Sequence, residues 1–150
     1  MYLGLKLLHI LLVIVAVGFN LSYGIWLARA AREPEHLGHV LRGIKTLDDR
    51  FANPSYGLIL VTGLAMTFVS GIPLTTFWIA AALVVYVVLV LMGVLLYSPT
   101  LRRQIAMFEA HGAQSPEYQA VARRGQIIGI SLVVPVLIIL YLMVSKPQPI

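Results

Sequence analysis

The sequence contains no cysteine and few charged residues, and each shortage excludes a class of protein. Without cysteine the chain has no disulfide, no thiolate metal site, no iron–sulfur cluster and no cysteine nucleophile. Charged residues make up 11% of its 150 residues, against roughly 25% in a soluble protein, and hydrophobic residues reach 59%. A chain of this length cannot bury that much apolar surface in its own core. We therefore expect an integral membrane protein whose apolar surface faces lipid.

The sequence also lacks the usual catalytic motifs. It has no phosphate-binding glycine loop, no nucleophile elbow and no pair of carboxylates inside an apolar run, so hydrolysis, phosphoryl transfer and transport through an acidic relay all lack residues. Its basic residues flank apolar runs and form no basic face with interleaved aromatic residues, so we expect no nucleic-acid partner. These absences predict a small membrane protein without catalytic apparatus of its own. Its expected surroundings are membrane lipid and, as an accessory subunit or a homo-oligomer, other membrane proteins.

Four apolar runs are long enough, or nearly long enough, to cross a membrane. A bilayer core about 30 Å thick takes roughly 20 helical residues. The first run is too long for a signal peptide, so we expect it to remain as a span. The predicted fold is all-α: a four-transmembrane-helix bundle in a single integral membrane domain over residues 1–150. Its spans are predicted at about 3–28, 54–70, 77–98 and 126–145.

The basic residues are distributed unevenly between the two sides of the predicted bundle. Five follow the first span and four follow the third, whereas each terminal region has one, Lys6 and Lys146. Because cytoplasmic loops are enriched in Lys and Arg, we expect both basic loops in the cytoplasm and both termini outside. The nine loop residues are Arg29, Arg32, Arg42, Lys45, Arg50, Arg102, Arg103, Arg123 and Arg124.

Both predicted cytoplasmic loops contain helical patterns. In the first loop apolar residues recur at helical spacing after Pro34, which predicts an amphipathic interfacial helix on the inner leaflet; the alternative is a helix that caps the bundle. In the second loop, Ser98-Pro99 and Ser115-Pro116 are predicted helix starts, and His111-Gly112 is a predicted helix end. The apolar positions of the first-loop helix are Leu37, Val40, Leu41, Ile44, Leu47 and Phe51.

Small residues at four-residue spacing predict the helix contacts, because helices in lipid associate through close packing and a few polar contacts. Gly63, Thr67 and Gly71 repeat in this way in the second span, and Gly125 and Gly129 do so in the fourth. We expect these faces to lie against other helices.

The candidate binding residues are His9, Lys6 and Met66. On a helical wheel His9 and Lys6 share one face with Asn20 and Tyr23, so this face should point into the bundle. A neutral His9 hydrogen-bonded to a neighbouring helix is one interpretation. The other is a metal-ligating His9, the axial ligand of a haem b or a porphyrin-associated residue, with Met66 at the same depth and Lys6 near a propionate. We expect Tyr86 and Tyr141 at that depth as well.

The remaining histidines provide only an incomplete site. His36 and His39 are three residues apart, a spacing at which two imidazoles can share a metal, but nothing in the sequence supplies the further ligands that a site needs. We interpret them as solvated loop residues.

Several segments resemble a bacterial family of predicted four-span integral membrane proteins of unknown function. These short segments are distributed over nearly the whole chain. In order they are Lys6 to Ile10, Asp49 to Pro54, Thr62 to Leu64, Pro116 to Tyr118, Ala122 to Arg124 and Leu142 to Pro147. The resemblance implies a multi-pass protein of the bacterial inner membrane. The first segment is also similar to the first helix of HemJ-type protoporphyrinogen oxidases, where it implies a haem-associated histidine at His9, and more loosely to copper-resistance membrane proteins. The HemJ-type pattern has a basic residue in its third helix, and the third span here has none.

Overall fold

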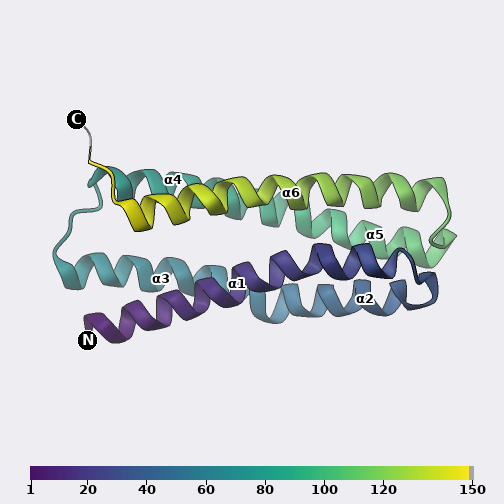
Figure 1. Ribbon diagram of the computed structural model, residues 1–150, viewed down its shortest axis with the longest axis horizontal. Helices are drawn as coiled ribbons and strands as arrows, with labels where there is room; N and C mark the ends of the chain where they lie inside the picture. Colours follow the sequence, from purple (N-terminus) through teal and green to yellow (C-terminus); the bar gives the residue numbers. More distant parts are fainter. Residues whose placement is uncertain (149–150) are drawn as a thin grey trace.

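The computed structural model describes residues 1–148, which form helices joined by short connections (Figure 1). Four helical rods in this part of the chain are long and apolar enough to cross a membrane, which confirms the predicted all-α four-helix membrane bundle. The second and third rods each contain one π-helical turn, named η1 and η2. The elements are α1 (Tyr2–Ala30), α2 (Pro34–Leu47), η1 (Asp48–Ala52), α3 (Asn53–Ser70), α4 (Phe77–Met92), η2 (Gly93–Tyr97), α5 (Ser98–His111) and α6 (Pro116–Ser145).

Proline, serine and glycine residues mark several ends of the helices. Pro34 occupies the first turn of α2, where a missing N–H costs nothing. The Ser115 hydroxyl accepts a hydrogen bond from the backbone N–H of Tyr118 at 3.1 Å, so the predicted start of α6 is confirmed. Gly112 follows the last residue of α5 with a φ of 78°, which confirms the predicted helix end.

α5 begins at Ser98, the predicted helix start, but the chain does not break there. The rod runs from α4 through η2 directly into α5, as the second rod runs from α2 through η1 into α3. In each rod a proline, Pro99 or Pro54, comes two residues after the π-helical turn. A proline ring clashes with the carbonyl four residues earlier in a regular α-helix, and we attribute its accommodation here to the wider turn that precedes it.

The rods form two pairs. α1 packs on α3, and α4 packs on α6, with the most extensive contacts in the molecule. Between the pairs, α2 packs on α5 and a shorter stretch of α1 meets α6. The start of α1, the end of α6 and the α3–α4 connection lie at one end of the bundle, named here the terminal end (Figure 1). The α1–α2 and α5–α6 connections lie at the other end, named the charged end because it carries the basic loops.

The predicted amphipathic helix exists as α2, but it extends α3 along the bundle instead of lying flat on a bilayer surface. Its apolar side chains find partners on α1, α5 and α6, so the structure supports the alternative of a helix that packs on the bundle. Together they form an apolar core at the charged end: Tyr23, Ala30, Leu37, Leu41, Ile44, Leu101 and Tyr118.

Gly63, Gly125 and Gly129 lie at helix contacts, as their spacing predicted, whereas Gly71 does not, because a Cβ there would meet nothing within 4 Å. A Cβ on Gly63 would lie 3.3 Å from the His9 ring, and one on Gly129 would lie 3.8 Å from the Tyr97 ring. Gly125 lies equally close to Gln104. Gly71 ends α3 with a φ of 67°, a conformation that glycine adopts without strain.

Candidate functional site

His9 lies in the contact between α1 and α3. Its Nδ1 is 2.8 Å from the Thr62 hydroxyl, which itself lies 2.8 Å from the Leu58 carbonyl. The hydroxyl has a single proton, so when it donates to Leu58 the imidazole must donate through Nδ1. In that arrangement Nε2 is the nitrogen with a free lone pair.

Lys6 and Met66, the other two predicted binding residues, lie close to His9 along the bundle axis. Lys6 is exposed one turn nearer the terminal end of α1, and Met66 is half-buried one turn beyond Thr62 on α3. Tyr141, placed by the sequence at the same depth, points outward with 64% of its surface exposed. None of these residues lines the cavity that lies between the two helix pairs.

The loop histidines do not form a metal centre in the structure. His36 and His39 are both exposed on α2. Within residues 1–148, no group of three or more His, Asp or Glu side chains is arranged to hold a metal ion.

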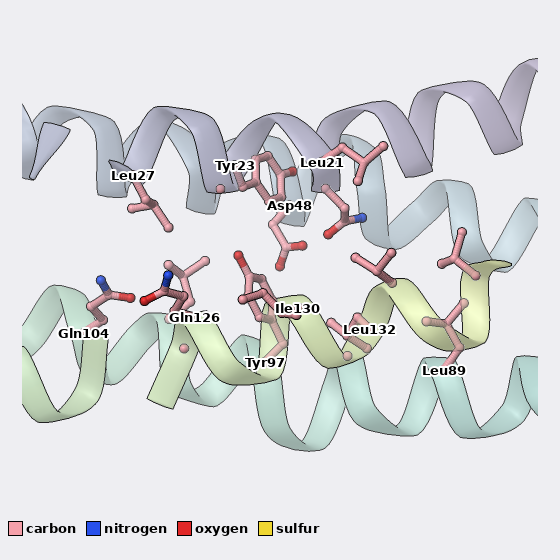
Figure 2. A pocket seen from close by; sticks show the side chains of 18 of the residues that line it. Leu21, Tyr23, Leu27, Asp48, Leu89, Tyr97, Gln104, Gln126, Ile130 and Leu132 are labelled. Carbon is pink, nitrogen blue, oxygen red and sulfur yellow. The ribbon is translucent and has the colours of Figure 1, made fainter. Parts of the chain in front are cut away.

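A cavity of about 980 Å³ lies between the two helix pairs. Toward the charged end it is lined by the amides of Gln104 and Gln126, and toward the terminal end by Leu89 and Leu132 (Figure 2). Between these two regions lies a group of polar side chains, named here the central polar cluster: Asn20, Tyr23, Asp48, Asn53, Tyr56 and Tyr97.

Asp48 is the acidic residue of the cavity wall, and it is only 4% exposed. It opens the π-helical turn η1, and its carboxylate accepts a hydrogen bond from the Asn53 amide at 3.2 Å. The nearby Lys45 ammonium is paired with Asp49 instead. No salt bridge of the described residues includes Asp48. A buried carboxylate without an opposite charge is costly, because it has lost its hydration.

Two tyrosines approach Asp48 from other elements. Tyr97, the last residue of η2, points its hydroxyl toward the Asp48 carboxyl group from the opposite wall, and Tyr23 of α1 lies beside them (Figure 2). Tyr23 is 2% exposed, and its hydroxyl has no hydrogen-bond partner among residues 1–148. Buried polar groups nearly always have a partner, so this hydroxyl requires an explanation.

Several other polar groups of the cavity wall have partners. The Asn20 amide donates to the Tyr56 hydroxyl at 2.9 Å, and the Tyr86 hydroxyl donates to the Tyr56 carbonyl, a bond that joins the two helix pairs. Gln104 donates to the Tyr118 hydroxyl at 3.2 Å. Tyr23 differs from these groups, because its hydroxyl is buried and has no partner among the described residues.

Sequence reasoning missed Asp48 because this residue lies in the predicted first loop, outside every predicted span. A signal was present: Leu37, Leu41, Ile44 and Asp48 follow one another at spacings of four, three and four residues, so they share one helix face. An acidic residue that continues an apolar face is the pattern of a buried, functional carboxylate.

The cavity has the chemistry of a binding site. It contains no serine, cysteine or lysine nucleophile beside a general base, and its wall combines a mainly apolar surface with a few convergent polar groups.

Four membrane-crossing helices with a cavity between their two pairs define a multi-pass helical membrane protein with a candidate binding site between its helices. The chain belongs to a family described as predicted integral membrane protein (DUF2269), whose model matches residues 3–147. This match confirms the resemblance to a family of membrane proteins of unknown function. No curated protein and no solved structure gives a significant match. The similarity of the first helix to HemJ-type and copper-resistance proteins stays a prediction.

Proposed function

We propose that this protein is a non-catalytic membrane protein that holds a lipophilic molecule in the cavity between its helix pairs, acting alone or as an accessory subunit of a membrane complex. The observation that carries the proposal is the cavity itself, about 980 Å³ in volume with a largely apolar wall around one buried polar cluster. Cavities of roughly 300–1,000 Å³ with this kind of wall are typical of small-molecule sites.

Photolabelling with a neutral, lipophilic aryl diazirine tests this proposal in lipid nanodiscs. Labelled residues are mapped by mass spectrometry. We expect label on Leu89 and Tyr23, which are 6% and 2% exposed and so are shielded from bulk lipid. Leu132→Trp places a larger side chain in the cavity and should reduce that label. The matched control Ile127→Trp, at a 57% exposed position outside the cavity wall, should leave it in place. Absence of label from both residues in the wild type would contradict the proposal.

We place the charged end in the cytoplasm of a bacterial cell and both termini outside the inner membrane. The uneven distribution of Lys and Arg supports this orientation. Compartment-sensitive reporters fused at Gln114 and at Pro147 should report opposite sides of the membrane. The same compartment for both fusions would contradict it.

Haem or porphyrin binding by His9 is a second candidate function. The observation that favours it is the hydrogen bond between Nδ1 and Thr62, because a ligating histidine is normally oriented through its other nitrogen. Met66, one turn beyond Thr62 on α3, is a candidate second ligand. Protein purified from haem-replete cells should then show a Soret band that His9→Ala removes and His36→Ala retains. A colourless wild-type protein would contradict this candidate and leave the cavity proposal intact.

A further inference from the structure

We propose that the cavity binds an amphipathic amine, with its ammonium group at Asp48 and Tyr23 and its apolar body toward Leu89 and Leu132. This inference rests on the proposed function and adds the chemical class of the ligand. It depends on three features of the central polar cluster: a buried carboxylate, an unpartnered hydroxyl and a change from polar to apolar lining.

The carboxylate determines the sign of the ligand's charge. Asp48 is 4% exposed, faces the cavity and has the Asn53 amide as its hydrogen-bond donor. The cation one turn earlier, Lys45, is held by Asp49, and Lys45 and Arg102 act on Asp48 only from beyond salt-bridge distance. Arg123 also lines the cavity but makes no salt bridge with Asp48. A cationic ligand supplies the direct ion pair that Asp48 lacks, whereas an anionic ligand would add a second buried negative charge.

The hydroxyl of Tyr23 indicates that the ligand carries hydrogen-bond donors. It is buried and has no partner among the described residues, although Asn20 and Tyr56 beside it are bonded to each other. A protonated amine has N–H groups that can donate to the Asp48 carboxylate and to this hydroxyl at once. The rings of Tyr23 and Tyr97 also offer aromatic faces to a cation.

The lining determines how the rest of the ligand lies. Figure 2 shows Leu89 and Leu132 on the terminal side of Asp48, with Gln104 and Gln126 on the opposite side. An apolar body therefore extends toward the terminal end, inside the membrane-crossing part of the bundle. No group of metal-binding side chains among residues 1–148 competes with an organic cation for this carboxylate.

Three matched probes test the inference by calorimetry on the protein in lipid nanodiscs, with empty nanodiscs subtracted. The probes are 1-adamantylammonium, its N,N,N-trimethyl derivative and the neutral 1-adamantanol. We expect the wild type to bind the ammonium at least tenfold more tightly than the alcohol. Equal affinities for these two probes in the wild type would overturn the inference without any mutation.

One variant and one control test whether the ammonium group binds at Asp48. Asp48→Asn keeps the shape of the side chain and should weaken ammonium binding at least tenfold, to the level of the alcohol. The control Glu109→Gln removes an exposed carboxylate that pairs with Arg42 away from the cavity wall, and it should bind like the wild type. Unchanged binding by Asp48→Asn would overturn the inference.

Tyr23→Phe separates hydrogen bonding from charge. It should weaken binding of the primary ammonium severalfold and leave the trimethyl derivative unaffected, because only the former donates N–H groups. Equal losses for both probes would show that Tyr23 does not accept a hydrogen bond from the ligand. If the neutral diazirine labels the cavity and the ammonium shows no preference, the amine inference fails while the proposed function stands; if the diazirine does not label it, both fail.

Discussion

Two polar regions of this bundle solve the same problem in opposite ways. In the α1–α3 contact, His9 is paired with Thr62, and Gly63 lets the two backbones approach closely. In the cavity wall, Asp48 has no salt bridge and Tyr23 has no hydrogen-bond partner among the described residues. The first region has its polar groups satisfied within the chain, and the second leaves these two groups without such partners.

The difference shows which polar groups hold the bundle together and which are available for a ligand. A satisfied pair between helices stabilises the association of those helices in lipid, where the hydrophobic effect contributes little. A buried polar group without a partner destabilises the free protein. Mutations should therefore lower the stability of the protein in the first region, and at the unpartnered groups of the second region they should leave it unchanged or raise it.

The largest effect is expected from Gly63→Leu. The new side chain meets the His9 ring, which a Cβ alone would approach to 3.3 Å, so the contact is overpacked. We expect a loss of about 1–3 kcal/mol in the free energy of unfolding, measured by thermal or denaturant unfolding in detergent. Gly57→Leu is the control on the same helix, since a Cβ there meets nothing within 4 Å and stability should be unchanged. Equal stability of the two variants would contradict the description of a tight α1–α3 contact.

His9→Ala tests the hydrogen bond of this contact without overpacking it. Thr62 retains the Leu58 carbonyl as its partner, so we expect a smaller loss, about 1 kcal/mol. The same unfolding assay measures it. Thr62→Val should cost a similar amount, and the double variant should cost less than the sum of the two, because the residues share one hydrogen bond. Fully additive losses would show that the pair is not coupled.

Tyr23→Phe should change stability in the opposite direction. It removes a buried hydroxyl that has no partner, so ligand-free protein should become more stable by up to about 1 kcal/mol. Tyr56→Phe is the contrasting variant, because its hydroxyl accepts a hydrogen bond from Asn20 and its removal should destabilise the protein. Destabilisation by Tyr23→Phe of the ligand-free protein would place that residue with the satisfied groups.

The smallest effect is expected from Leu132→Trp, which adds volume at the cavity wall. Because the cavity has room for the larger ring, the free energy of unfolding should change by no more than about 0.5 kcal/mol. A loss as large as that of Gly63→Leu would show that the helix pairs are packed tightly there.

Much of the fold could be predicted from the sequence because its signals are local. Hydropathy indicates the spans, and Ser115, Gly112 and Pro34 mark helix ends through their own backbone chemistry. The spacing of Gly63 and Gly129 indicates contact faces without naming the partners.

The candidate site could not be predicted in the same way because it is assembled from distant parts of the chain. Tyr23, Asp48 and Tyr97 come from three rods, and their approach depends on how the two pairs are set against each other. Asp48 also lies before residue 54, where its span was predicted to start, because the second rod begins well ahead of the apolar run. A prediction of spans from hydropathy treats a residue outside the apolar run as part of a solvent-exposed loop.

The apolar core at the charged end implies that the molecule has two sources of stability. The rod Pro34–Ser70 has 37 residues and spans about 55 Å at 1.5 Å per residue, more than a bilayer core of about 30 Å covers. Leu41, Ile44 and Leu101 at the charged end are therefore buried mainly by exclusion of water, while the terminal half is held by packing between helices in lipid. Urea and cooling weaken only the first kind of cohesion. Mild denaturant should thus loosen the charged end while the membrane-embedded half stays folded.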